Sequence, residues 1–429
     1  MKNLDYASRK EIFGWAMYDF ANSGFTTVVL TAIFNTYYVN VIAGHLPNGE
    51  ATFFWTLVIG FANGLVLLSA PIVGAIADYS AAKKRFLAVT TVGCVIFTAL
   101  LAMLGPRDII LAGIFVVLAS VMFYSGENLI AAFLPEISPP EKMGRISAFG
   151  WTLGYIGGML VLGLCLAYVN YAESRMQTAE QYVPVTMLIV AACFALASLP
   201  TFLWVRESAK PQRHEQSVNY LHIGYARLQS TWQHARHYQD LFRFLLCLTV
   251  FYCGINTVVI LAAVYANEVM GFSTQDSILL ILTVNITAAV GAFIFGWLQD
   301  SIGSLTSIKL TLMIWVIAMI MAYFTDQRVG FWIVANLIGL ALGSSQSAGR
   351  AIVGLFSPAE RSGEFFGLWG LATKLSAIIG PVSYGLITRV SHGDHRLALL
   401  STCVFFIAGF LLLFTVDEQR GRAATAKVF

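Results

Sequence analysis

The sequence predicts an all-α membrane protein in which twelve transmembrane helices form two pseudo-symmetric six-helix bundles. Its composition, the length of its apolar runs and an internal repeat support this class. The chain has 429 residues, of which 58% are hydrophobic and 11% are charged, whereas about 25% of the residues of a soluble domain are charged. Because so few charges cannot cover the water-facing surface of a soluble protein of this size, we infer that the chain lies in a lipid bilayer.

Twelve apolar runs account for the helices. Each is long enough, as a helix, to cross a hydrocarbon core of about 30 Å. Glycine and proline inside the runs, such as Pro71, Gly157 and Pro381, indicate close helix packing and local kinks. The runs cover residues 12–42, 52–77, 86–104, 109–134, 146–170, 183–205, 241–266, 277–299, 305–325, 330–355, 365–390 and 397–416.

A Gly-x-x-x-Asp pattern closes the second run and returns at the end of the eighth. Gly74 and Asp78 form the first copy, and Gly296 and Asp300 form the second. Three basic residues, Lys83, Lys84 and Arg85, follow the first copy. Gly303 and one basic residue, Lys309, follow the second. The second copy has fewer basic residues, so we expect its contact to be the weaker of the two.

A second pattern recurs with nearly the same shift. Residues 138–144 read SPPEKMG, and residues 357–363 read SPAERSG. Two unrelated patterns that shift together by half the chain indicate two homologous halves in parallel, as in alternating-access carriers. We therefore divide the chain into an N-terminal bundle of residues 1–205, a cytoplasmic linker of residues 206–240 and a C-terminal bundle of residues 241–429.

The linker has apolar side chains at helical spacing between Leu221 and Tyr238. This spacing predicts an amphipathic helix. Two interpretations stay open: a lateral helix that lies in the membrane interface, and a connector that docks on the protein.

Basic residues predict the orientation. With the N-terminus in the cytoplasm, 17 of the 26 Lys and Arg residues fall in cytoplasmic segments and 4 in external loops, and the other five lie inside the runs. Such a bias indicates that both termini are cytoplasmic. The net charge of +3 then reflects topology and does not indicate a nucleic-acid partner. All six cysteines fall inside the runs, so we expect no disulfide framework.

The Gly-x-x-x-Asp copies have the features of a gate. A glycine lets a neighbouring helix approach closely, and an aspartate at a helix end can pair with a basic residue or with the N-terminus of another helix. Such contacts would hold the two halves together on the cytoplasmic side until substrate-driven rocking breaks them. In the alternative interpretation these charges only anchor the topology.

Four ionisable side chains stand out inside apolar runs, where a charge deep in the membrane costs about 2.5–3.5 kcal/mol on insertion scales. They are Asp19, Glu127, Arg350 and Lys374. Lys374 lies nine residues into its run, roughly 14 Å deep at 1.5 Å per residue. Charges at this depth indicate a hydrated path, in which the bases would hold a carboxylate or other anion and the acids a proton or an ammonium group. Alternatively, they pair only with one another and hold the halves together.

Polar neighbours of these charges are further candidate site residues. They are Asn22, Asn128, Asn256 and Gln346.

The repeated gate pattern resembles that of the major facilitator superfamily. The resemblance implies that helices one, four, seven and ten line the cavity, and that helices three, six, nine and twelve face lipid. The buried charges fall where this arrangement would place the substrate pathway.

Longer strings resemble one branch of that superfamily, the vacuolar amino-acid effluxers of the autophagy pathway and their bacterial relatives. Residues 15–23 read WAMYDFANS, residues 134–137 read LPEI and residues 144–147 read GRIS. In the second half, the resemblance covers the Gln346-x-x-x-Arg350 spacing, the EFFG string at residues 364–367, Lys374, and the Gly-Pro pair at residues 380–381. One position departs from the branch, because Cys253 stands where the branch has an aspartate.

This resemblance implies a secondary active transporter that works by alternating access of the rocker-switch type. The expected substrate is a small polar or zwitterionic metabolite, most simply an amino acid, with protons as a candidate coupling ion. The compact loops are typical of a bacterial inner-membrane protein. Two alternatives stay open, an exporter of amphipathic drug-like or lipid compounds and a non-transporting membrane sensor with the same fold.

Neither catalysis nor a cofactor is expected. The buried acids lie on separate runs and have no oriented nucleophile or metal cluster beside them, and no phosphate-binding motif is present. We therefore expect a monomer in the lipid bilayer whose partners are a small-molecule substrate and a coupling ion, without metal, cofactor or nucleic acid.

Overall fold

The structure is a computed structural model that describes residues 7–47, 50–207, 220–233 and 236–425. These residues form twelve helical spans that are long and apolar enough to cross a membrane. The spans are composed of α1 (Arg9–Gly24) with η1 (Phe25–Ala32), α2 (Phe34–Tyr37) and η2 (Tyr38–Ile42); α3 (Glu50–Ser80); α4 (Lys83–Leu100) with η3 (Leu101–Met103); α5 (Ile109–Ala131) with α6 (Leu134–Ile137); η4 (Pro140–Lys142) with α7 (Met143–Ser174); α8 (Ala179–Trp204); α10 (Gln239–Met270); α11 (Thr274–Ile302); α12 (Ser304–Phe324); α13 (Arg328–Leu355); η5 (Ala359–Arg361) with α14 (Ser362–Val390); and α15 (His395–Ser401) with α16 (Cys403–Leu412) and η6 (Leu413–Thr415). The predicted fold class and the number of spans are confirmed.

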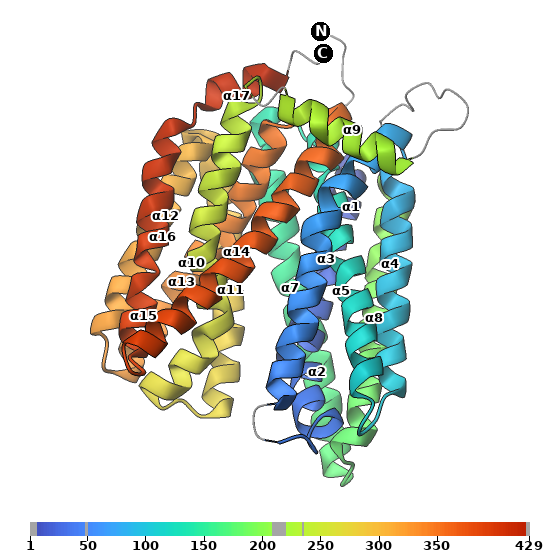
Figure 1. Ribbon diagram of the computed structural model, residues 1–429, viewed down its shortest axis with the longest axis vertical. Coiled ribbons are helices and arrows are strands. Elements are labelled where there is room, and N and C mark those ends of the chain that lie inside the picture. Colours follow the sequence, from blue (N-terminus) through green and yellow to red (C-terminus); the bar gives the residue numbers. More distant parts are fainter. Residues whose placement is uncertain (1–6, 48–49, 208–219, 234–235, 426–429) are drawn as a thin grey trace.

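The helices divide into two bundles (Figure 1). The N-terminal bundle contains α1–α8, and the C-terminal bundle contains α10–α16. The helix α9 (Tyr220–Gln233) runs across the end of the molecule at which α1 begins, and α17 (Glu418–Thr425) lies at the same end. We call this the latch end, because the two gate motifs make their contacts between the bundles there.

The observed helices extend beyond the apolar runs at several ends. The fifth span begins at Pro140 and ends at Ser174, whereas its apolar run covers residues 146–170. Polar residues at helix ends continue the backbone hydrogen-bond pattern outside the hydrocarbon region, so hydropathy alone places the ends too far inside.

Small residues bring α1 and α7 into close contact. Gly150, Gly154 and Gly157 of α7 lie so close to α1 that a Cβ atom added at any of them would contact Asp19 or Phe20. Helices in membranes associate through such small residues because bare backbones can approach each other closely. This packing holds the buried Asp19 against the inner face of the N-terminal bundle.

Large apolar side chains on the third, sixth, ninth and twelfth spans are exposed, as expected of helices that face lipid. Examples are Val89 on α4, Leu203 on α8, Phe324 on α12 and Val404 on α16, each at least 66% exposed.

The linker helix α9 packs on α3, where its Gly224 lies against Ile72 and Ile76. Tyr225 on the same helix is 65% exposed. The predicted helix extends to Tyr238, but α9 ends at Gln233 and residues 234–235 lie outside the described residues. Residues 208–219 also lie outside them, so the boundaries of the linker stay a prediction.

Candidate functional site

The first gate motif lies at the contact between α3 and α14. Gly74 is so close to the carbonyl of Gly363 that a Cβ atom would not fit between them. The buried carboxylate of Asp78 accepts the backbone N–H groups of Gly363 at 2.9 Å and of Glu364 at 2.8 Å. These N–H groups belong to the first turn of α14 and have no partner within their own helix. Asp78 therefore caps a helix of the opposite bundle, and we call this contact the first latch.

Lys83 completes the first latch. Its side chain is fully buried, and its ammonium nitrogen lies 3.3 Å from the carboxylate of Asp78 and 2.8 Å from the hydroxyl of Ser362. It also forms an ion pair with Glu136 of α6. One lysine thus neutralises two acids and reaches across to α14, as a buried ammonium group requires.

The two basic residues after Lys83 lie outside this contact. Lys84 donates to the backbone oxygen of Val205 at 2.6 Å, within the N-terminal bundle. Arg85 is exposed and makes no hydrogen bond or ion pair with the described residues. Of the predicted basic cluster, Lys83 alone reaches the opposite bundle among the residues described here.

The second gate motif makes the equivalent contact between α11 and α7. Gly296 lies against Ala148 of α7. The carboxylate of Asp300 accepts the backbone N–H groups of Gly144 at 3.0 Å and of Arg145 at 3.2 Å, in the first turn of α7. The Nε atom of Arg145 lies 3.1 Å from the same carboxylate, and the Arg145 side chain is 40% exposed. We call this contact the second latch.

The basic partner in the second latch comes from the opposite bundle. Arg145 supplies it, whereas Lys309 lies over the ring of Phe414 at 4.1 Å. Gly303 ends α11 with a φ of +92°, a conformation that favours glycine. The sequence contained a signal for Arg145, because it follows the last residue of the second repeated pattern.

Two capping acids were missed in the sequence. Glu207 accepts the backbone N–H groups of Lys83 and Lys84 at the start of α4. Glu418 accepts those of Ser304 and Leu305 at the start of α12. A detectable signal existed, because residues 205–207 read VRE after the sixth span and residues 416–418 read VDE after the twelfth.

Asp19 and Arg350 form a buried ion pair between the bundles. The Nη1 atom of Arg350 on α13 lies 2.7 Å from the carboxylate of Asp19 on α1. The guanidinium also donates to the hydroxyl of Ser147 at 3.1 Å and to its backbone oxygen at 2.7 Å. It lies 4.7 Å from the ring of Trp15 and 5.3 Å from that of Trp151. This pair corresponds to the alternative in which buried charges join the two halves.

Lys374 and Glu127 have a different environment. The ammonium of Lys374 on α14 lies 3.0 Å from the ring centre of Tyr124 on α5. Neither Lys374 nor Glu127 makes a hydrogen bond or an ion pair with the residues described, although the two are close enough to interact electrostatically. Both side chains are partly exposed. The structure therefore places two opposite charges from opposite bundles within electrostatic range of each other, without an ion pair or hydrogen bond among the described residues.

The predicted polar neighbours occupy separate positions. Gln346 accepts a hydrogen bond from Tyr155 and joins α13 to α7. Asn256 donates to the hydroxyl of Ser376 at 3.0 Å and joins α10 to α14. Asn22 is buried on α1. None of these three residues contacts Lys374 among the interactions of the described residues.

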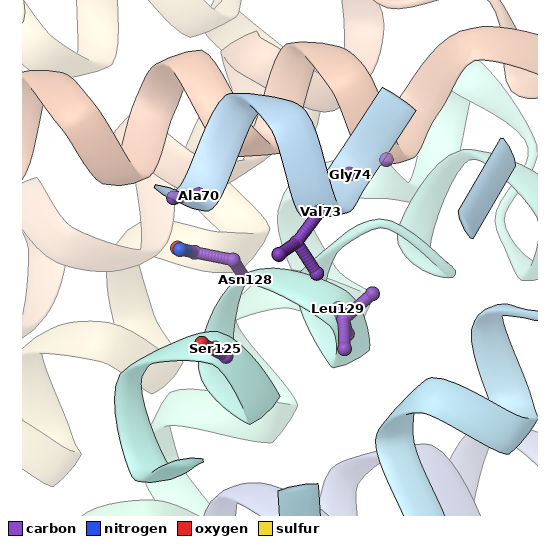
Figure 2. A pocket seen from close by; sticks show the side chains of 7 residues that line it. Ala70, Val73, Gly74, Ser125, Asn128 and Leu129 are labelled. Atoms are coloured by element: carbon purple, nitrogen blue, oxygen red, sulfur yellow. The ribbon is translucent and has the colours of Figure 1, made fainter. Parts of the chain in front are cut away.

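Asn128 lines a small pocket beside the first latch (Figure 2). The pocket lies between α3, α5 and α14, and Asn128 and Ser125 of α5 face Ala70 and Val73 of α3 across it. The side-chain amide nitrogen of Asn128 is buried without a hydrogen-bond partner among the described residues.

Tyr252 on α10 is a candidate site residue that sequence analysis missed. It is 5% exposed, and its hydroxyl has no hydrogen-bond partner among the described residues. It lies close enough to Glu127, Arg350 and Tyr155 to interact with each electrostatically. Its position among aromatic residues of the seventh span gave no sequence signal, because aromatic residues are also common in ordinary helix packing.

Comparison with known proteins identifies the family. A family model described as "Vacuole effluxer Atg22 like" matches residues 48–144 and 140–426. The chain belongs to this family. The Atg22-like chain is 26% identical over 413 residues to the uncharacterized MFS-type transporter YxiO of Bacillus subtilis (strain 168), and the match covers 96% of this chain and 95% of YxiO.

More distant relatives and solved structures agree on the fold. Autophagy-related protein 22-1 of Aspergillus fumigatus is 24% identical over 326 residues, and the match covers 70% of this chain but 53% of the fungal protein. The human organic anion transporter MFSD10 has a TM-score of 0.74 at 14% identity, with 94% of this chain and 99% of that chain covered. The proton:xylose symporter XylE has a TM-score of 0.69 at 15% identity, with 96% of both chains covered. The Atg22-like chain is thus a multi-pass membrane protein with the major facilitator fold, and transport is its general function.

Proposed function

We propose that this Atg22-like protein is a secondary carrier of amino acids or similar small zwitterions. The observation that carries the proposal is the pair of unused charges, Lys374 on α14 and Glu127 on α5, which belong to different bundles. A zwitterion carries a carboxylate for Lys374 and an ammonium group for Glu127. The ring of Tyr124 lies beside the ammonium of Lys374 in a cation–π contact.

Alternating access follows from where the bundles touch. Both latches lie at the end where the bundles join through hydrogen bonds, and no hydrogen bond between described residues joins them at the opposite end. We infer an outward-open conformation in which the latch end is cytoplasmic, as the distribution of basic residues predicts for both termini, and place the protein in the cell membrane of a bacterium.

Proton coupling is a further part of the proposal. The carboxylate of Asp19 has its cation on the opposite bundle, so rocking of the bundles would separate it from Arg350. A buried carboxylate without a cation is unfavourable unless it takes up a proton. Asp19 and Glu127 are therefore the two candidate proton carriers, and Cys253 leaves the seventh span without the acid found in the branch.

The experiment is uptake of a labelled amino-acid mixture into proteoliposomes, with and without a pH gradient. We expect uptake by the wild type and a roughly ten- to one-hundredfold lower uptake by the Lys374→Ala variant, since one charge-assisted contact with the substrate carboxylate contributes roughly 1.5–3 kcal/mol. The Lys309→Ala variant is the matched control, because Lys309 lies over Phe414 near the latch end. Absence of uptake for every zwitterion would refute the proposed function, and full activity of Lys374→Ala would refute the role of that residue.

A further inference from the structure

Two of the buried hydrogen-bond donors that have no partner among the described residues lie close to Arg350. They are the hydroxyl of Tyr252 on α10 and the indole N–H of Trp151 on α7. Buried polar groups are nearly always hydrogen-bonded, so each such group requires an explanation. Because the two residues lie on different bundles, a ligand between the bundles could satisfy both.

Both donors lie beside Arg350. The Arg350 guanidinium is 5.3 Å from the ring of Trp151. The hydroxyl of Tyr252 lies 3.4 Å from where a Cβ atom on Gly349, the neighbour of Arg350, would be. Arg350 has five N–H donors, and its bonds to Asp19 and Ser147 leave two of them without a partner among the described residues. This corner of the site therefore offers hydrogen-bond donors to a ligand, next to the ion pair of Arg350 and Asp19.

The balance of unused groups favours a ligand rich in acceptors. The unused donors include the Lys374 ammonium, the Trp151 indole and the Tyr252 hydroxyl, and the buried Trp369 indole and Asn128 amide nitrogen also lack a partner among the described residues. Glu127 supplies an unused carboxylate. A zwitterion with an apolar side chain would occupy Lys374 and Glu127 and would leave Trp151 and Tyr252 unsatisfied. A site with buried donors rejects a ligand that cannot use them.

We propose that the preferred substrate is an acidic amino acid, aspartate or glutamate, whose side-chain carboxylate accepts hydrogen bonds from Tyr252 and Trp151 beside Arg350. The inference rests on the proposed function, because it assumes that Lys374 and Glu127 bind the backbone carboxylate and ammonium groups. A carboxylate is the group that matches two neutral donors next to a guanidinium.

Competition in wild-type proteoliposomes tests the proposal without any variant. Uptake of labelled glutamate and aspartate is measured with unlabelled glutamate, aspartate, glutamine or leucine as competitor. We expect the acidic amino acids to compete at least about tenfold better than leucine, in line with the loss of one to two buried hydrogen bonds. Equal competition by leucine would overturn the inference, and would show that water satisfies the two donors.

The Tyr252→Phe variant removes one hydroxyl and keeps the ring. We expect it to lower the ratio of acidic amino-acid uptake to leucine uptake roughly tenfold. Tyr265→Phe on the same helix is the matched control, because the buried Tyr265 hydroxyl already donates to the backbone oxygen of Ala322 at 3.1 Å, and its ratio should stay that of the wild type. An unchanged ratio in Tyr252→Phe would overturn the role of Tyr252.

Failure of this inference differs from failure of the proposed function. Uptake of leucine without uptake of glutamate or aspartate would refute the acidic substrate and keep the zwitterion carrier. Absence of uptake for every amino acid would refute both.

Discussion

The carboxylate of Asp78 accepts the backbone N–H group of Gly363 at 2.9 Å, across the boundary between the two bundles. The same pair of helices is in backbone contact one turn away, where Gly74 meets Gly363. An aspartate on α3 thus caps α14, and a glycine four residues earlier makes room for the helix that is capped. The hydrogen bond and the close approach depend on each other, which explains why the two residues occur together in both gate motifs.

Substitution of Gly74 by alanine should prevent closure of the first latch. The added Cβ atom would collide with the carbonyl of Gly363, and backbone atoms cannot move aside as a flexible side chain can. We expect the conformational equilibrium to shift toward the state that is open at the latch end, measured as a longer spin-label distance between the latch ends of α3 and α14. Gly60→Ala on the same helix is the control, because nothing lies within 4 Å of its Cβ position. The same distance in both variants would contradict this role of Gly74.

Substitution of Asp78 by asparagine should weaken closure more than substitution of Asp300. Asp78 is buried and has Lys83 beside it, whereas Asp300 pairs with an arginine that is 40% exposed. A buried hydrogen-bonded charge contributes roughly 1.5–3 kcal/mol, and an exposed ion pair contributes about 0–1 kcal/mol. The same spin-label measurement, with a second pair on α7 and α11, compares the variants. A larger opening in Asp300→Asn would reverse the order we predict for the two latches.

Substitution of Lys83 by methionine should destabilise the protein strongly. Removal of one member of a buried ion pair costs about 3–5 kcal/mol because the remaining charges lose their partner, and here both Asp78 and Glu136 lose theirs. We expect a clear fall in the thermal unfolding temperature in detergent. Lys84→Met is the matched control, since Lys84 donates to a backbone oxygen at 2.6 Å and is partly exposed, and its effect should be about 1 kcal/mol or less. Equal unfolding temperatures for the two variants would exclude the structural role of Lys83.

The ion pair between Asp19 and Arg350 should show strong coupling. Asp19→Asn leaves a buried guanidinium without its carboxylate, and Arg350→Gln leaves a buried carboxylate without its cation. Each single substitution should therefore cost about 3–5 kcal/mol. The double variant should be less destabilised than the sum of the two, as for groups in direct contact. Thermal unfolding of the four proteins gives the coupling energy, and additive effects would mean that the pair does not hold the bundles together.

Much of the gate could be predicted from sequence, because its parts are local. A glycine and an aspartate four residues apart lie on one helix face, so their spacing already indicates a helix contact with a charge at its end. The partners could not be predicted in this way. Arg145 lies in a different bundle from Asp300, and Glu418 reaches the start of α12 from beyond the last span.

The four charges inside the apolar runs could also be predicted from sequence only in part. Hydropathy was sufficient to find Asp19, Glu127, Arg350 and Lys374, because a charge inside an apolar run stands out from its neighbours. Which of these charges form an ion pair could not be predicted from sequence, since Asp19 and Arg350 lie 331 residues apart in the chain. Tyr252 was missed because an aromatic residue in an apolar run does not stand out, and its significance comes from a hydroxyl that lacks a partner.

The order of residues along the chain was enough to establish twelve membrane helices in two related halves. The cost of exposing polar groups to lipid acts on each helix separately, so each helix appears in the sequence as its own apolar run, and the repeated motifs relate the two halves. Which buried charges form ion pairs with each other depends on contacts between helices from different halves. Coulomb and hydrogen-bond energies change over a few ångströms, so packing of the two bundles sets Arg350 against Asp19 and leaves Lys374 and Glu127 without an ion pair among the described residues.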